Sequence, residues 1–360
     1  MGDGCLSLYS TNDFAGTVRL EGGVTKVFSK ERPFGSAAEG GEIVIDQLTG
    51  RAVLQSFGAV IDKPIALVGA DVSSSRFSFR GSYGTNVVAA AFTQTGDRLN
   101  WYLEGNSVTT LAGGGSFAGP VHFDPADTAL RTLVVEGPPI VQPTLGNRDR
   151  AFKFHGKTEL HLKNPGNRMY IELGAASQGA GSALHCWTND VLNYQCDIIL
   201  GYGSTLDLHG FDQQVGDLQT GSAGRIRSDE PATLLAYYDI KEGVTWGANG
   251  GIDGAVTFRK SGPKPLTING TNTTTGALVA FAGQLVMGET ACWQGTDVRV
   301  GLETSNRHPS LRLMRSDSFP NARTSRAASV RACWAHLEKE GLLFQKPLRH
   351  TRANAFRQSA

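Results

Sequence analysis

The sequence lacks several features that would assign it to a common class of protein. Its formal net charge is only +1 over 360 residues, from 34 basic and 33 acidic side chains, so electrostatic attraction does not indicate a nucleic-acid partner. No stretch approaches the roughly 18 consecutive apolar residues that a membrane-spanning helix needs. Residues 1–5 contain neither a basic nor an apolar region, and we therefore expect no signal peptide in this chain.

Cysteine is also scarce. The five cysteines are scattered and include no Cys-x-x-Cys pair, which excludes a zinc ribbon and a thioredoxin-like redox motif. An odd, sparse set is not a disulfide framework. The sequence leaves open whether Cys186 and Cys196 pair across adjacent turns or remain buried free thiols.

Long amphipathic helices are missing before residue 320. Apolar residues instead alternate with polar ones in short runs, which is the periodicity of β-strands. Gly, Asn, Asp or Ser follows almost every run and supplies a turn, and the 45 glycines have no Gly-X-Y period, which excludes collagen. The pattern predicts an all-β fold, either a sandwich, a propeller or a solenoid. Examples of such runs are 6–8, 18–20, 43–45, 160–162, 206–208 and 266–268.

Internal repetition favours the solenoid. Residues 4–18 and 264–278 share the pattern aliphatic-x-aliphatic, two turn residues, then Thr-Asn-x-x-x-Gly-x-aliphatic. One coil cannot bury its own hydrophobic face, whereas stacked coils bury a continuous one. We expect the aliphatic pairs to point into a narrow interior, and an inward Asn to stack on the matching Asn of the next coil. Longer loops are predicted at about 80–120 and 136–160, where the pattern lapses.

Two segments resemble a known family. Residues 259–288 resemble the autotransporter-associated β-strand repeat of bacterial surface-protein passenger regions, although Thr274 stands where that repeat usually has an aromatic residue. Residues 204–218 resemble a Leu-Asp-Leu-Asn-Gly-Phe-Asn-Gln-x-Val stretch common in the same proteins, with His209 and Asp212 in place of asparagines.

The resemblance implies a right-handed parallel β-helix over residues 1–301, with repeats near 1–24 and 259–288. A repeat of roughly 22 residues per coil predicts about 13 coils and a rod of about 60 Å.

Residues 302–360 differ from the rest of the sequence, with eleven basic and four acidic side chains. We expect this basic tail to be irregular, disordered or a short helix at 327–343, after one further strand near 311–319. A basic arm for an anionic polymer is the functional alternative, and translation in a shifted reading frame is another.

Candidate catalytic residues are few. Asp207, Asp212 and Asp217, with Arg225 and Arg227, form the one cluster with the carboxylates and basic groups that a glycan-cleaving site requires. Their five-residue spacing places the three carboxylates within one or two coils.

Histidines raise the question of a metal site. His155, His161 and His185, together with Cys186, are residue types that bind metal ions, but their spacing gives no rigid ligand pair. We therefore predict no metal site and no cofactor.

The first functional hypothesis is a non-catalytic display segment of a secreted or surface-exposed bacterial autotransporter-like protein, acting as an adhesin or a spacer. The alternatives are a β-helical polysaccharide lyase or glycoside hydrolase, and a truncated or frame-shifted product without independent function. Expected partners are host or extracellular glycans and proteins, together with end-to-end copies of the chain, because open solenoid ends expose strand edges. We expect contact with an outer membrane only through an anchor or barrel, and we expect neither within this chain.

Overall fold

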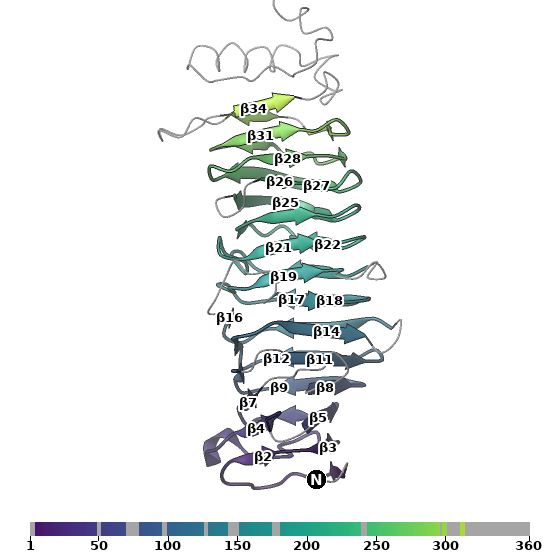
Figure 1. The fold of residues 1–360 in the computed structure, drawn as a ribbon, viewed down its shortest axis with the longest axis vertical. Coiled ribbons are helices and arrows are strands. Elements are labelled where there is room, and N and C mark those ends of the chain that lie inside the picture. The colour runs from purple at the N-terminus through teal and green to yellow at the C-terminus, as the bar shows by residue number, and fades with distance from the viewer. Residues whose placement is uncertain are drawn as a thin grey trace, which may run out of the picture.

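The computed structural model describes residues 4–48, 52–69, 79–95, 99–125, 129–142, 151–174, 181–238, 243–295, 297–300 and 310–313. Within these ranges the chain winds into an elongated stack of short parallel strands (Figure 1). The one helical element in this part of the chain is a 3-10 turn, η1 (Ala37–Glu39). The predicted all-β solenoid is thus confirmed, whereas its right-handed sense stays a prediction.

Three sheets form the faces of the first coils. The first contains, in order, β1 (Cys5–Leu8), β3 (Gly23–Val27), β5 (Ala52–Phe57), β8 (Phe79–Ser82), β11 (Leu99–Glu104), β14 (Val121–Pro125), β17 (Phe152–Phe154), β19 (Tyr170–Leu173), β21 (Asp197–Leu200) and β24 (Leu218–Thr220). The second contains β2 (Val18–Leu20), β4 (Ile43–Asp46), β7 (Ile65–Val68), β10 (Phe92–Gln94), β13 (Gly115–Phe117) and β16 (Ile140–Val141).

The third sheet has twelve strands, eleven in its main path and β23 beside it, and carries the side chains of the candidate site. It contains β6 (Val60–Ile61), β9 (Thr85–Val88), β12 (Val108–Leu111), β15 (Arg131–Val135), β18 (Thr158–Leu162), β20 (Ala183–Cys186), β22 (Thr205–Asp207), β25 (Arg225–Tyr237), β27 (Gly251–Ser261), β30 (Leu278–Ala280) and β33 (Val298–Val300), with β23 (Gln213–Val215) paired to β25. Two smaller sheets complete the later coils: β26 (Val244–Thr245), β28 (Leu266–Ile268), β31 (Gln284–Met287) and β34 (Ser310–Leu313), and the pair β29 (Thr271–Asn272) and β32 (Cys292–Trp293).

The length of a coil varies. Cys5 pairs with Val24, 19 residues later, whereas Val121 pairs with Phe152, 31 residues later. Strand β34 pairs in parallel with β31, so the solenoid includes a strand beyond residue 301, as the sequence predicts near residue 311. The predicted helix at 327–343 and the rest of the tail lie outside the described residues.

Alternation along each strand builds the core. In β18 the side chains of Thr158, Leu160 and Leu162 are buried, while those of Glu159 and His161 face outward. The inward residues of successive coils join into a single hydrophobic cluster that extends from Leu20 to Trp293. Burial of this apolar surface is what stabilises a stack of coils that individually have no closed interior.

Buried amides link successive coils, though not in the predicted way. The Asn272 side chain accepts a hydrogen bond from the Ile252 backbone N–H at 3.0 Å and donates one to the Cys292 carbonyl oxygen at 3.1 Å. Asn167 connects the backbones of Ile140 and Val191 in the same manner. These amides therefore bond to the backbone of the coils above and below, where the sequence predicted Asn-on-Asn stacking.

The structure also tests the two predicted loops and the pairing of the two cysteines. The predicted loop at 80–120 is wrong, because the described residues of this segment form the stacked strands β8 to β13. The loop predicted at 136–160 lies partly outside the described residues, and the remainder contributes to β16, β17 and β18. Cys186 and Cys196 are both buried free thiols, which resolves the choice that the sequence leaves open.

Candidate functional site

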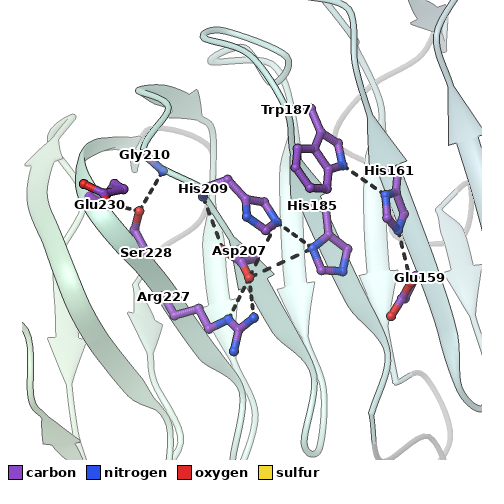
Figure 2. Close-up of polar contacts among 10 residues, drawn as sticks. All are labelled: Glu159, His161, His185, Trp187, Asp207, His209, Gly210, Arg227, Ser228 and Glu230. Atoms are coloured by element: carbon purple, nitrogen blue, oxygen red, sulfur yellow. Dashed lines mark hydrogen bonds and ion pairs between the residues drawn. The ribbon is translucent and has the colours of Figure 1, made fainter.

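A row of polar side chains crosses the outer surface of the third sheet. The parallel register places His161 of β18 beside His185 of β20, His185 beside Asp207 of β22, and Asp207 beside Arg227 of β25. Because neighbouring strands lie only about 4.8 Å apart, one residue from each coil contacts the next. Figure 2 shows these side chains facing one another across the strands.

His161 is held between a donor and an acceptor. The Trp187 indole N–H donates a hydrogen bond to Nδ1 of His161 at 3.0 Å. Indole nitrogen can only donate, so Nδ1 of His161 carries no proton and the Nε2–H of His161 donates to Glu159 at 3.1 Å. These two contacts fix one neutral tautomer of His161, and they also fix the position of Trp187.

His185 and His209 share one proton. Nδ1 of His185 lies 2.9 Å from Nε2 of His209, and the Oδ2 atom of Asp207 lies 3.6 Å from the same His209 nitrogen. The Trp187 ring stacks on the His209 ring with centroids 4.2 Å apart. His209 lies two residues after the end of β22 and adopts a left-handed backbone conformation with φ of +49°. The ring of His209 lies against those of His185 and Trp187, which belong to the preceding coil (Figure 2).

The turn that carries His209 is bonded to the next coil. The Gly210 N–H donates to Oγ of Ser228 at 2.9 Å, and Oγ of Ser228 in turn donates to the carbonyl oxygen of Glu230. The His209 N–H donates to Oδ1 of Asp207 at 3.2 Å. These bonds hold the imidazole of His209 in place although it lies outside any strand.

Asp207 is the centre of charge in this cluster. Its side chain is only 2 % exposed, Nε of Arg227 donates a hydrogen bond to its Oδ2 atom at 2.7 Å, and Nη2 of Arg227 forms an ion pair with the same oxygen at 2.6 Å. The side chain of Arg227 is half exposed, so the ion pair seals the carboxylate against solvent on one side. On the other side the carboxylate faces the two imidazoles.

Burial makes His185 a neutral imidazole at pH 7. Removal from water is the largest cause that lowers the pKa of His185 to about 4, and the neighbouring imidazole of His161 lowers it further. Its Nε2 atom is buried and has no hydrogen-bond partner among the described residues. His185 is therefore an uncharged imidazole at the centre of the cluster, and its Nδ1 atom faces His209 and Asp207.

The three aspartates predicted as catalytic do not converge. Asp207 lies in the cluster, but exposed Asp212 accepts a hydrogen bond from the Thr233 N–H at 2.6 Å. Asp217 is buried, and its charge contributes, after burial itself, to raising the pKa of Tyr238. The predicted basic residues separate as well, since Arg227 pairs with Asp207 whereas Arg225 pairs with Asp253.

The residues considered for metal binding in the sequence do not all lie together. Cys186 is buried in the core, where burial raises its pKa, and the ring of His155 stacks on His122. His161 and His185 do meet, with ring centroids 4.6 Å apart. Within the described part of the chain, two groups have ligand atoms close enough to hold a metal ion: Glu159, His161 and His185, and His185, Asp207 and His209.

Sequence reasoning missed Glu159, Trp187 and the role of His209. His161, His185 and Asp207 follow one another in the sequence at intervals of about one coil. This spacing identifies them as neighbours only once the pairing register of the strands is known.

Among the described residues no helix is long and apolar enough to cross a membrane. No family model, curated protein or solved structure gives a significant match to the chain.

Proposed function

We propose that this chain is a rigid, non-catalytic display segment of a secreted or surface-exposed autotransporter-like protein, with an adhesin or spacer role. The observation that carries the proposal is the single hydrophobic cluster extending from Leu20 to Trp293 through the stacked coils. A continuous core of this kind gives a rod whose outer faces vary without loss of the fold.

Interaction with a partner is proposed to occur through exposed aromatic side chains. Trp187, Tyr194 and Tyr202 are 41 %, 57 % and 54 % exposed, although large aromatic rings are usually buried. Aromatic rings on a rigid scaffold provide contact area at little entropic cost, and glycans and proteins both bind to such rings. Several weak contacts along one rod strengthen binding to a long polymer without any single strong site.

The density dependence of binding tests this proposal. The full chain is immobilised on a sensor at sparse and at dense coverage and exposed to long glycan polymers and to their short fragments. We expect retention of the polymers to increase steeply with coverage, weak retention of the fragments, and reduced retention for Trp187→Ala and Tyr202→Ala. Equal retention of polymer and fragment at both coverages contradicts a multivalent display role.

A second candidate function is cleavage of a polysaccharide. It is favoured by Glu159 and Asp207, which lie on β18 and β22 and each have a carboxylate oxygen within 4.8 Å of a ring nitrogen of His185. Inverting glycosidases hold their two carboxylates about 6.5–9.5 Å apart. We place this function second because Asp207 is bonded to Arg227 and is almost completely buried.

A further inference from the structure

We propose that His185, His209 and Asp207 bind a divalent transition-metal ion of the Zn²⁺ class on the outer face of the solenoid. The sequence predicts no metal site, and this inference is independent of the display role. It rests on the positions of three side-chain atoms: Nδ1 of His185, Nε2 of His209 and Oδ2 of Asp207.

The distances between these atoms fit one metal ion. His185 Nδ1 and His209 Nε2 are 2.9 Å apart, His209 Nε2 and Asp207 Oδ2 are 3.6 Å apart, and His185 Nδ1 and Asp207 Oδ2 are 4.0 Å apart. A tetrahedral zinc ion with bonds of about 2.0–2.1 Å requires ligand atoms about 3.3 Å apart. The three observed separations lie around that value, so small side-chain rotations complete the site.

The chemistry of the ligands selects the type of metal. Two imidazole nitrogens and one carboxylate suit Zn²⁺, Cu²⁺ and Ni²⁺, whereas Ca²⁺ and Mg²⁺ prefer a shell of oxygen atoms. Three protein ligands leave a fourth position for water or for a donor atom of a bound partner.

The surrounding residues hold the ligands in place. Trp187 stacks on His209 and is itself anchored by its hydrogen bond to His161. The His209 N–H donates to the second oxygen of Asp207, so the turn and the carboxylate are already joined. Such outer contacts pre-orient metal ligands and contribute to affinity.

Two interactions in the metal-free form compete with the ion. One is the hydrogen bond between His185 and His209, whose proton moves to a ring nitrogen that does not bind the ion when both ligand nitrogens do. The other is Arg227, which occupies Oδ2 of Asp207 but has a half-exposed side chain that is able to turn into solvent. Removing this arginine is therefore expected to strengthen metal binding, a result that a purely structural role for the cluster does not predict.

Calorimetric titration of the chelator-treated full chain with ZnCl₂ tests the proposal. We expect one saturable site, weakened more than about tenfold in His209→Asn and in Asp207→Asn. Asparagine is the substitution of choice at position 209 because it tolerates the left-handed backbone there. Arg227→Gln is expected to bind zinc more tightly than the original chain, and MgCl₂ is expected to give no saturable heat.

Two matched variants serve as controls. His155→Asn removes a histidine outside the cluster, and Cys5→Ser removes an exposed thiol. Both are expected to bind zinc as the original chain does, with circular dichroism confirming the fold of every variant. X-ray absorption at the zinc edge is expected to detect two imidazole ligands. The proposal is overturned if no saturable zinc site exists, if His209→Asn and Asp207→Asn bind normally, or if either control loses the site.

Discussion

Arg227 and Asp207 lie opposite each other on neighbouring coils, and two nitrogen atoms of the arginine contact the same carboxylate oxygen at 2.7 and 2.6 Å. The carboxylate is 2 % exposed while the arginine is half exposed. The ion pair therefore closes the outer edge of the histidine cluster and connects β22 to β25.

Asp207→Ala is predicted to lower the free energy of unfolding by about 2 kcal/mol, because it leaves Arg227 and the His209 N–H without their acceptor. The cost stays below the 3–5 kcal/mol typical of a fully buried pair, since Arg227 regains water. Urea unfolding followed by circular dichroism measures it. Asp212→Ala, which removes an exposed aspartate, is the control and is predicted to cost less. Equal effects of the two variants argue against a structural role for the ion pair.

The aromatic core near β11 gives a second prediction. Trp101 is completely buried, and its ring contacts Phe79, Phe92 and Phe123 with centroids 4.8, 5.3 and 5.4 Å away. Trp101→Ala is predicted to cost about 3–5 kcal/mol through cavity formation. Trp101→Phe retains a ring and is predicted to cost clearly less. Tyr202→Ala, at an exposed ring, serves as the control, and a loss there equal to that of Trp101→Ala contradicts the packing argument.

Glycine has two separable roles in the turns. Gly270 has φ of +72°, and a Cβ atom there would collide with the carbonyl oxygen of Gly250 on the adjacent coil. Gly40 has φ of +77° but open space where a Cβ would be placed. Gly40→Ala is therefore predicted to cost about 1–3 kcal/mol from backbone strain alone, and Gly270→Ala clearly more, because strain and collision add there. Thermal unfolding of the two variants measures the difference, and an equal loss contradicts close coil stacking at Gly270.

Lys260 gives a prediction about pH. Its side chain is buried, Nζ donates to the carbonyl oxygens of Gly262 and Ala282 at 2.6 and 2.7 Å, and burial lowers its pKa to about 7. The unfolded chain keeps this proton up to about pH 10.5, so between pH 7 and about 8.5 the unfolded state binds more protons than the folded state. The contribution of Lys260 to the free energy of unfolding therefore increases with pH in this range.

Urea midpoints at pH 7.0 and 8.5 test the sign of this contribution. The urea midpoint is predicted to increase less between pH 7.0 and 8.5 in Lys260→Met than in the original chain. In this variant the folded and unfolded states no longer differ in the protonation of residue 260. Lys264→Met, at a partly exposed lysine, is predicted to retain the original pH dependence. The same pH dependence in both variants contradicts the buried position of the Lys260 ammonium group.

Much of the fold was predictable, because strand alternation and the repeated pattern at 4–18 and 264–278 both reflect inward-facing aliphatic residues. The wrong loop prediction at 80–120 has a physical cause. Buried positions there are often polar, including Asn86, Gln94, Asn100 and Thr109. Polar side chains at inward positions conceal the alternation from any reasoning that relies on hydrophobicity.

The site was less predictable than the fold. Asp207 and Arg227 were identified as chemically promising, yet the carboxylates expected beside Asp207 bond elsewhere. The true neighbours, His185 and His209, are separated by a full coil in the sequence, and the described coils vary from 19 to 31 residues. Such variation prevents the prediction of register from spacing, and register alone decides which outward side chains meet.

The central claim is that the rod displays a binding surface without catalysis, and incubation of the full chain with pectins, mucin glycans and alginate tests it most directly. Retained polymer and released products are quantified in the same samples. The account predicts retention of at least one polymer with no new reducing or unsaturated ends. Product formation by the original chain that is lost in Glu159→Gln and Asp207→Asn contradicts the account and establishes a glycan-cleaving site on the third sheet.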